Sequence, residues 1–312
     1  MSSSPNSDEA LLDELRPASF AIAYRMLGSV ADAEDIVQEA LLRTHQTIAA
    51  GQHLDSPRAF VATVTTRLAI DELRSARVRR EQYVGEWLPE PIVTDGLDDP
   101  VSQAELADSL SIATLRLLES LSPEQRATLL LHDVFDYRYG EIAEIIGKSE
   151  ANVRKLGTRA RRHVEESRPR FQTSQQQREE LARRFFAAAR EGNLGELEAL
   201  LAADVTLTGD GGGKVPSLPR MIRGRSRVAK TLRNWLRFRR RVGEGSIREV
   251  QINGAPGALL LDADGLLFGV WSLEIVGGEI MSLSSIVNPE KLAHIGPPAD
   301  FAGMLRKARE PN

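Results

Sequence analysis

The sequence has 312 residues and no cysteine, so disulfide bonds, thiolate zinc sites and cysteine nucleophiles are excluded. It also lacks long apolar runs, whereas a membrane-spanning helix needs about 20 consecutive apolar residues. The stretch from Met1 to Glu9 has neither the basic nor the apolar region of a signal peptide. We therefore expect a cytoplasmic protein with no membrane partner.

Neither sign of charge dominates the chain, but the charges are unevenly distributed. The formal net charge is −4, and residues 1–172 hold 28 acidic and 20 basic residues. From Glu86 to Glu124 there are nine acidic residues and a single basic one, Arg116. A basic cluster precedes this stretch and consists of Arg74, Arg77, Arg79 and Arg80. Such segregation favours two DNA-contacting segments joined by an acidic linker.

The second basic segment lies in residues 139–164, which predict two helices around a tight turn. Gly147 can end the first helix in the left-handed conformation, and Ser149 can cap the second. One face of the second helix is apolar, and the other carries Ala151, Arg154, Lys155, Thr158, Arg161 and Arg162. This pattern predicts a helix-turn-helix whose second helix enters the DNA major groove, with its first turn on base edges and its later arginines on phosphates. An αα-hairpin with a solvated basic face is the alternative, but five cations without one carboxylate between Arg154 and Arg162 favour DNA.

Three further helices are predicted in the N-terminal part, at 9–30, 32–44 and 58–75. One face of the second helix collects polar side chains, namely Asp32, Asp35, Gln38 and Glu39. Taken alone, this is a solvated acidic face near a helix N-terminus, where acids are favourable. Tyr83 and Trp87 flank the arginine cluster and could either stack on unpaired bases or simply pack.

An acidic segment rich in proline and glycine, residues 85–105, predicts a linker. Helices at 106–120 and 123–135 follow it. Together with the helix-turn-helix they predict a second all-α domain over 106–168.

Residues 9–168 resemble the extracytoplasmic-function (ECF) sigma factors. Four motifs occur in the order and spacing of that family, and they are Asp32-Ala-Glu-Asp-Ile-Val-Gln-Glu-Ala, Ala69-Ile-Asp-Glu-Leu-Arg, Leu121-Ser-Pro-Glu-Gln-Arg and Glu141-Ile-Ala-Glu-Ile-Ile-Gly. The resemblance implies that 9–84 is region 2, which binds core RNA polymerase and the −10 element. It implies that 106–168 is region 4, which reads the −35 element. Gly157 departs from the family, where a larger apolar residue is more usual, and a glycine inside a helix costs about 1 kcal/mol.

The resemblance also implies roles for single residues. In the family, the face that holds Asp35, Gln38 and Glu39 docks on the β′ clamp of core polymerase, and we expect the β flap as a further contact. The loop at 49–57, with Asp55 and Ser56, matches the segment that captures a flipped base of the −10 element. The arginine cluster matches a DNA-contacting stretch, and the helix at 150–166 matches the reader of the −35 element.

The pattern changes after residue 177. Two helices are predicted over 178–201 and one near 226–239, while strand-like runs occur at 205–208, 246–252, 258–261, 266–275 and 279–287. Helices leading into a curved antiparallel sheet predict an α+β domain over 178–295, followed by a tail at 296–312. The run from Phe185 to Val205 resembles the SnoaL-like, NTF2-like cone fold.

Three motifs resemble those of the ECF subgroup in which a SnoaL-like domain is fused to the sigma regions. They are Trp87-Leu88-Pro89-Glu90-Pro91, Asp210-Gly211-Gly212-Gly213-Lys214 and Asn288-Pro289-Glu290-Lys291-Leu292. By themselves, three glycines allow close backbone approach or an anion-binding turn, and an Asn-Pro pair predicts the start of a short helix. The resemblance implies a regulator in cis that faces the sigma domains, so we expect no requirement for a separate anti-sigma factor.

Enzymes with the cone fold use Asp, Tyr or His residues in their pocket. All four tyrosines lie before residue 140, and the only histidine after residue 171 is His294. Four aspartates remain and are compatible with turns: Asp204, Asp210, Asp262 and Asp264. We expect no catalytic residue, cofactor or metal site, while a small-molecule pocket without chemistry stays open.

The sequence thus predicts a multidomain alternative sigma factor, with two all-α sigma domains followed by an α+β cone domain. Its expected partners are core RNA polymerase and promoter DNA. Two other classes remain as alternatives. One is a stand-alone helix-turn-helix regulator with a small-molecule-sensing domain, and the other is a cone-fold enzyme with a DNA-binding extension.

Overall fold

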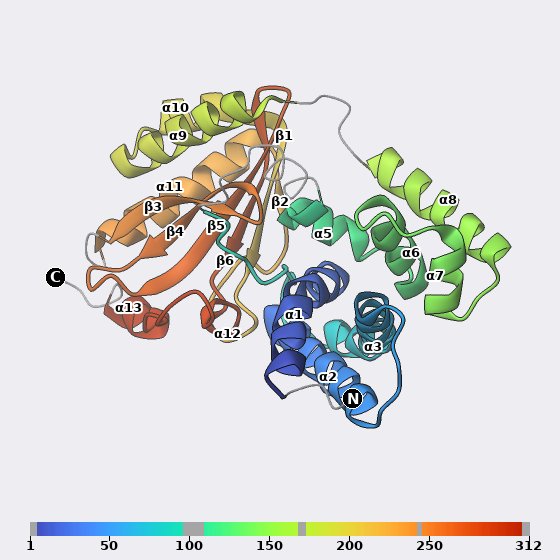
Figure 1. Ribbon diagram of the computed structural model, residues 1–312. Coiled ribbons are helices and arrows are strands. Elements are labelled where there is room, and N and C mark those ends of the chain that lie inside the picture. The colour runs from blue at the N-terminus through green and yellow to red at the C-terminus, as the bar shows by residue number, and fades with distance from the viewer. Residues whose placement is uncertain (1–4, 96–108, 168–172, 242–244, 308–312) are drawn as a thin grey trace. The chain divides into compact units, whose positions relative to one another are not determined.

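A computed structural model of the chain describes residues 5–95, 109–167, 173–241 and 245–307 (Figure 1). The chain divides into two compact units. Unit 1 comprises residues 1–82 and 115–168, and unit 2 comprises residues 83–114 and 169–312. Within the described ranges, no helix combines the length and the apolar character needed to cross a membrane.

The N-terminal half of unit 1 consists of three mutually packed helices, α1 (Pro5–Leu27), α2 (Val30–Ala49) and α3 (Pro57–Glu81). Gly28 separates α1 from α2 at a φ of 68°, and the side chain of Ser29 caps α2 by accepting a hydrogen bond from the Asp32 amide. The third helix continues six residues beyond its predicted end at residue 75, so the arginine cluster lies on the helix itself.

The C-terminal half contains α6 (Pro123–Asp133), α7 (Tyr139–Ile146) and α8 (Glu150–Ser167), preceded by the short α5 (Ile112–Leu118), which spans the boundary of the two units. Gly147 ends α7 at a φ of 66°, as its position predicts. The apolar stripe of α8 is buried and packs where α8 meets α6 and α7. The predicted helix-turn-helix is therefore present.

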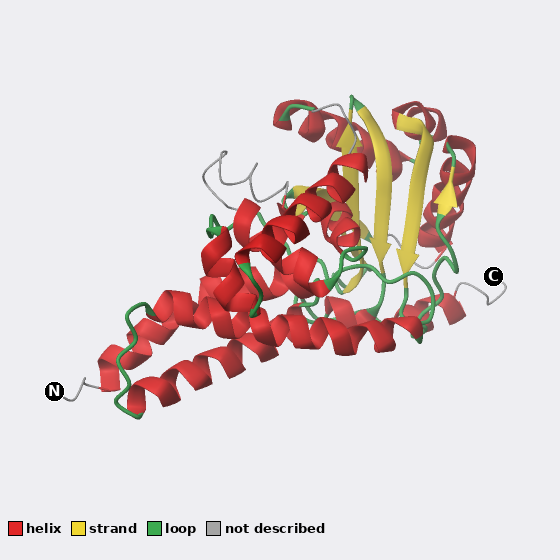
Figure 2. Ribbon diagram, turned by 90° about the vertical axis from the view of Figure 1, so that its right-hand side faces the viewer, coloured by secondary structure: helices red, strands yellow, loops and turns green. Residues whose placement is uncertain are grey.

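Unit 2 contains a six-stranded sheet in the order β2-β1-β6-β5-β4-β3. The strands are drawn in yellow in Figure 2, with helices beside them in red. Its strands are β1 (Leu201–Asp210), β2 (Ile222–Arg223), β3 (Ser246–Ile252), β4 (Ala255–Leu261), β5 (Leu267–Val276) and β6 (Glu279–Ile286). Strands β1 and β6 pair in parallel, so the expectation of an antiparallel sheet is wrong for this pair. The pair joins the first strand to the end of a four-stranded meander, and local strand patterns do not encode such a long-range pairing.

Two apolar clusters cover the sheet. Helices α9 (Gln175–Glu191), α10 (Leu194–Leu200) and α11 (Arg225–Arg241) share one cluster with Trp271 of β5. Alternate side chains of a strand point to opposite faces, and Val270 accordingly belongs to the other cluster. That cluster also holds Leu88 and Ile112 from the segment between the two halves of unit 1, and Leu292 from α12 (Pro289–Leu292). A last helix, α13 (Phe301–Lys307), ends the described part.

The predicted linker at 85–105 is packed on unit 2 as far as residue 95. Val93 forms an antiparallel bridge with Ile252 of β3, and Leu88 is completely buried. Residues 96–108, which include part of the helix predicted at 106–120, lie outside the described ranges. The segment that connects the two halves of unit 1 is thus held by the sheet of unit 2.

Candidate functional site

Asp210, at the end of β1, is the centre of a buried polar cluster in unit 2. Its side chain is 0% exposed, in contrast to the turn position that the sequence allowed. The carboxylate accepts hydrogen bonds from the Tyr83 hydroxyl at 2.6 Å and the Leu88 amide at 2.8 Å. It also accepts one from the Gly212 amide at 3.0 Å and forms an ion pair with Lys291 at 2.7 Å. A buried carboxylate needs such donors, and the segment 83–114 between the two halves of unit 1 supplies two of these four, from Tyr83 and Leu88.

Lys291 is the cationic partner, with a side chain that is only 6% exposed. Its ammonium group also donates to the carbonyl oxygen of Leu88. It lies 4.2 Å from the ring centroid of Trp87 and 5.0 Å from that of Tyr83. A desolvated cation–π contact contributes about 2 kcal/mol. For Tyr83 and Trp87 the sequence allowed either stacking on bases or packing, and in the structure both rings pack against Lys291.

Asn288 and the triple glycine close the cluster. The Asn288 side chain caps α12 through the Glu290 amide and donates to the Tyr83 hydroxyl at 3.0 Å. Gly212 has a φ of 60°, and a Cβ there would lie 2.2 Å from the Asn288 side-chain nitrogen, so only glycine fits. Burial, together with the hydrogen bond to Asp210, raises the pKa of Tyr83 well above its ordinary value. Tyr83 therefore remains a proton donor at neutral pH.

The three sequence motifs thus meet around one ion pair. We call this set of residues the linker clamp, and it consists of Tyr83, Trp87, Leu88, Asp210, Asn288 and Lys291. Pro89 is buried beside Leu88, and Gly211 packs against its own loop, where a Cβ would lie 2.3 Å from the Val215 oxygen. Gly213 approaches Val84, and Pro289 and Leu292 form the first and last residues of α12. Lys214 differs because it pairs with Glu290 at 2.9 Å in an exposed position.

A second attachment of the linker was missed by the sequence analysis. Asn253 is completely buried with a φ of 54°, and its amide and side-chain oxygen bond to the backbone of Ile92 at 2.8 and 2.9 Å. Its side-chain nitrogen donates to the Leu110 carbonyl at 3.1 Å. The pair Asn253-Gly254 is a hairpin-turn sequence, which predicts the turn between β3 and β4 but not its contact with the linker.

The predicted polymerase-binding residues lie together on α2. Asp35 and Gln38 are exposed, while Asp32 and Glu39 are partly exposed, and the opposite side of α2 is buried. Leu42, which the sequence analysis did not include, is 48% exposed one helical turn further along. The surface therefore combines acidic groups with an exposed apolar side chain.

The residues predicted to contact the −10 element are more dispersed. Asp55 lies exposed in the loop before α3, and the Ser56 hydroxyl caps α3 by accepting from the Ala59 amide. Arg74 forms ion pairs with Asp71 at 3.0 Å and with Glu124 of α6 at 2.8 Å. Arg77, Arg79 and Arg80 lie on α3, but their side chains are outside the described part.

The recognition surface of α8 is mostly open to solvent. Its exposed members are Ala151, Arg154, Lys155, Thr158 and Arg162. Arg161 differs, because it donates to Asp133 of α6 and, at 2.9 Å, to the Tyr139 hydroxyl. Hydrogen bonding to Asp133 raises the pKa of Arg161. Arg161 therefore fixes α8 to the preceding helices, whereas the neighbouring Arg159 is exposed.

Gly157 has a packing role on the inner side of α8. A Cβ at this position would lie 3.3 Å from the Tyr139 ring and 3.4 Å from the Thr128 methyl group. The Tyr139 ring in turn lies 4.9 Å below the Arg154 guanidinium. The Tyr139 ring therefore occupies the space that a larger residue at position 157 would need.

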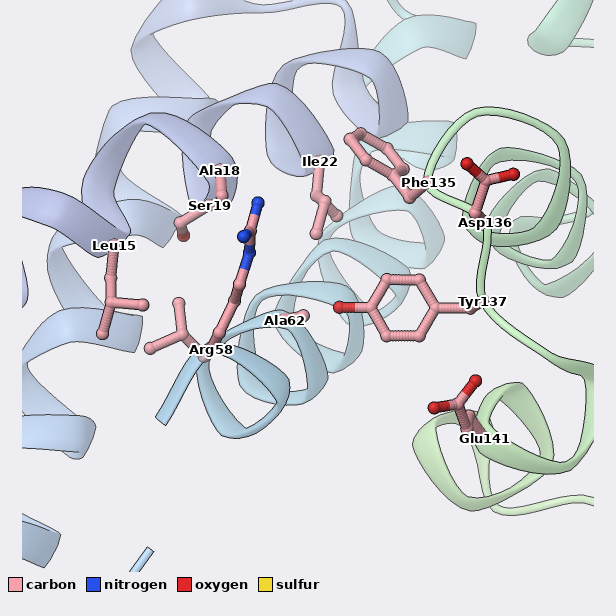
Figure 3. Close-up of a pocket in the computed structure, with 11 residues that line it drawn as sticks. Leu15, Ala18, Ser19, Ile22, Arg58, Ala62, Phe135, Asp136, Tyr137 and Glu141 are labelled. Carbon is pink, nitrogen blue, oxygen red and sulfur yellow. The ribbon is translucent and has the colours of Figure 1, made fainter. Parts of the chain in front are cut away.

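The two halves of unit 1 contact each other directly. Arg67 of α3 donates to the carbonyl oxygens of Ile145 and Glu144 at the end of α7, at 2.8 and 3.0 Å. The buried Arg126 of α6 donates two hydrogen bonds to the Arg25 carbonyl at the end of α1. A cavity of about 290 Å³ lies beside this interface. Figure 3 shows its lining, where side chains of α1 and α3 meet those of the loop before α7.

A smaller cavity of about 90 Å³ lies in unit 2 beside α13. Its lining is mostly apolar and includes four aromatic side chains, namely Trp235, Phe268, Trp271 and Phe301. Its polar lining groups are the hydroxyls of Ser217 and Ser285, and the second of these accepts from the Trp271 indole at 3.1 Å. No acidic residue, histidine or tyrosine is among the described residues that line it.

Comparison with known proteins matches residues 11–79 to the family Sigma-70 region 2 and residues 111–164 to Sigma-70, region 4. The ECF RNA polymerase sigma factor SigJ of Mycobacterium tuberculosis is 39% identical over 294 residues, which cover 89% of this chain and 91% of SigJ. The probable ECF RNA polymerase sigma factor SigI of the same species is 32% identical over 87% of this chain and 90% of SigI.

Among solved structures, the crystal structure of M. tuberculosis SigJ superposes with a TM-score of 0.72 at 37% identity, covering 91% of this chain and 98% of SigJ. The likeness therefore extends through both sigma regions and the mixed-sheet unit. It argues against a stand-alone helix-turn-helix regulator, because region 2 is present as well as region 4. The chain belongs to the ECF sigma factors, the alternative sigma factors that direct bacterial RNA polymerase to promoters, in the form with a fused SnoaL-like domain.

Proposed function

We propose that the SnoaL-like unit regulates this sigma factor in cis by holding the linker between region 2 and region 4. The observation that carries the proposal is the linker clamp, in which Tyr83, just before the linker, and Leu88, within it, both donate to the buried carboxylate of Asp210. The backbone carbonyl of Leu88 is in turn bound by Lys291. The linker is therefore part of the interior of unit 2 at this point.

Promoter geometry explains why holding the linker matters. Elements centred on −10 and −35 are about 25 base pairs apart, which is about 85 Å of B-form DNA at 3.4 Å per base pair. A compact unit of the size of unit 1 is roughly 35–40 Å across. Regions 2 and 4 pack on each other in this unit through Arg67 and Arg126. They must separate before both can bind one promoter, so the closed unit is proposed as the resting state.

The linker clamp supports the resting state because it leaves fewer residues free in the segment that connects region 2 to region 4. Fully extended, the 32 residues from Tyr83 to Thr114 could span about 110 Å. The clamp and Asn253 attach this segment to unit 2 near both of its ends. Release of the clamp exposes the Asp210–Lys291 pair to water, which solvates both charges. Opening the clamp therefore costs less free energy than removing one charge, which would leave the other charge buried without a partner.

The finer assignments of the sigma regions are part of the same proposal. The α2 surface with Asp32, Asp35, Gln38 and Glu39 docks on the β′ clamp, and region 4 meets the β flap. The loop with Asp55 and Ser56, together with the arginine cluster, engages the −10 element, and α8 reads the −35 element. Regulation in cis removes the need for a separate anti-sigma factor, and the factor acts in the cytoplasm with the polymerase.

The SnoaL-like unit is proposed to be non-catalytic. Support comes from its apolar cavity, whose described lining offers only serine hydroxyls and no group suited to general acid–base chemistry. The aspartate expected in a turn, Asp210, is instead engaged by the linker clamp.

Abortive initiation with core RNA polymerase on a pool of bacterial genomic fragments tests the regulation. The clamp variants are Tyr83→Phe, which removes one hydrogen bond, and Lys291→Met, which removes the cation. Lys214→Met is the matched control, because Lys214 lies in the same group of motifs but is exposed and does not touch the linker. We expect both clamp variants to raise product formation several-fold at limiting core enzyme, and the control to behave as wild type. Equal activity of all four proteins would leave the SnoaL-like unit without a regulatory role.

A further inference from the structure

The segment from Gly211 to Gly243 has an unusual charge. These 33 residues contain 11 lysines and arginines and no acidic residue, in a chain whose net charge is −4. The segment includes β2 and the whole of α11, whose 17 residues carry eight of the cations. Neither region 2 nor region 4 contains it, and none of its residues belongs to the linker clamp, although the Gly212 amide at its start donates to Asp210.

The structure places three of the cations of α11 on a different side of the helix from its buried apolar residues. Val228, Leu232 and Leu236 are buried in the main core of unit 2. Arg227, Lys230 and Arg237 are exposed, and their spacing of three and seven residues places them on one face of the helix. From Arg227 to Arg237 this face extends for about 15 Å at 1.5 Å per residue.

Helix α9 of the same unit shows what an ordinary solvated arginine face looks like. Three exposed arginines of α9 each have a carboxylate partner, and the pairs are Arg183–Glu180, Arg184–Glu196 and Arg190–Glu249. In contrast, Arg227, Lys230 and Arg237 have no ion-pair partner among the described residues. The two carboxylates at the start of α11 are engaged by other groups, Glu279 by Arg225 and Glu198 by the Ser226 hydroxyl.

A row of cations without local acids is complementary to a regular row of anions. The DNA phosphate backbone presents one negative charge per about 1.7 Å of helix axis, and arginine binds phosphate through its planar, forked donors. Phosphate contacts of this kind position a protein on the duplex without reading its sequence. An acidic protein surface is the other polyanion available in a transcription complex, and the test below distinguishes it.

The covalent connection places DNA within reach. Seven residues separate Ser167, the last residue of the recognition helix, from Gln175, the first residue of α9. They span at most about 25–30 Å. When α8 lies in the major groove, unit 2 is therefore confined to the neighbourhood of the duplex, at roughly millimolar effective concentration.

We propose that α11 is a second DNA-binding surface, which contacts the phosphate backbone of duplex DNA through Arg227, Lys230 and Arg237. The contact is independent of sequence and adds affinity to the specific contacts of region 4. The proposal does not depend on the linker clamp. The proposed surface is the exposed face of α11, on the other side of the helix from the residues that pack in the main core.

The test measures binding of the full-length protein to a fluorescent 30-base-pair duplex of random sequence, by anisotropy, between 50 and 200 mM salt. The variant is the triple substitution Arg227→Gln, Lys230→Gln and Arg237→Gln. Glutamine is a good helix former, and circular dichroism checks the fold of the variant. The matched control, Arg183→Gln with Arg184→Gln and Arg190→Gln, changes the net charge of the same unit by the same amount.

Loss of three phosphate contacts reduces the slope of log K against log salt by about 2.7. Across this fourfold range of salt, binding by the wild type should therefore weaken about 40-fold more than binding by the α11 variant. The control should keep the wild-type slope. The proposal is overturned if the α11 variant keeps the wild-type slope, or if both triple variants reduce it equally. A variant that keeps the slope but loses affinity for core polymerase would assign α11 to an acidic protein surface instead.

Discussion

The linker clamp and the recognition helix α8 both depend on charged side chains, but they use them in opposite ways. The Asp210–Lys291 pair is buried, and its charges are satisfied by several fixed donors and acceptors. The pair Arg154–Glu150 on α8 is 61% and 48% exposed, and an exposed ion pair of this kind holds its arginine only weakly. Buried charges therefore hold the structure of the linker, whereas exposed charges remain available for a partner.

The largest expected effect is the loss of the buried cation. Lys291→Met leaves the Asp210 carboxylate without its counter-ion, which should reduce the free energy of unfolding of unit 2 by about 3–5 kcal/mol. Lys214→Met removes an exposed pair and should cost about 0–1 kcal/mol. Denaturant unfolding followed by tryptophan fluorescence measures both values. The double variant Asp210→Asn with Lys291→Met should recover part of the loss. Similar values for the two single variants would contradict the assignment of a buried pair.

The acidic residues of α2 are at least partly exposed, whereas the charged pair of the linker clamp is buried. Replacing Asp35 and Glu39 by lysine should weaken binding of core polymerase by about 2–5 kcal/mol, because like charges then meet across the interface. The free energy of unfolding should hardly change, since both side chains are at least partly exposed. Pull-down of core enzyme measures the effect, and the charge-matched control is the double substitution of the exposed Glu165 and Glu179 by lysine. Equal retention of core enzyme by the double variant and the wild type would refute the docking surface.

Substitutions on α8 should separate base contacts from phosphate contacts. Arg154→Ala or Lys155→Ala should relax selectivity at particular −35 positions by about 1–3 kcal/mol. Arg159→Ala and Arg162→Ala should weaken binding to all promoters and flatten its salt dependence. Arg161→Ala should instead lower the thermal stability of region 4, because it removes the contacts with Asp133 and Tyr139. The same sequence-independent loss for every variant would show that the recognition face is misplaced.

The smallest effect is expected at Gly157. Alanine favours the helix by about 1 kcal/mol over glycine, but its Cβ would press on Tyr139 and Thr128. The two effects oppose each other, so Gly157→Ala should change the free energy of unfolding by about 1 kcal/mol or less. Thermal unfolding measures the change. A loss of several kcal/mol would mean that Tyr139 cannot shift by the few tenths of an ångström that the Cβ requires.

The sequence predicted the elements of unit 1 well, because amphipathic spacing and the helix-ending Gly147 are local signals. It identified the three motifs of unit 2 only through their resemblance to a subgroup. The burial of Asp210 and its pairing with Lys291, 81 residues away, were not predictable, because no local pattern distinguishes a buried aspartate from a turn aspartate. The parallel pairing of β1 with β6 and the hydrogen bonds between Asn253 and Ile92 also join residues far apart in the sequence, so local patterns do not predict them.

The distance between region 2 and region 4 tests the central claim most directly. Because the chain contains no cysteine, Gln46→Cys on α2 and Glu166→Cys on α8 provide the only two attachment sites for a pair of fluorescent dyes. Single-molecule energy transfer in the free full-length protein should show one short distance, as expected for a closed unit. The same measurement on Tyr83→Phe should show a larger population at long distance, and addition of core polymerase should shift both proteins toward it. An identical distance distribution for wild type and Tyr83→Phe, with and without core polymerase, would contradict control of the two regions by the linker clamp.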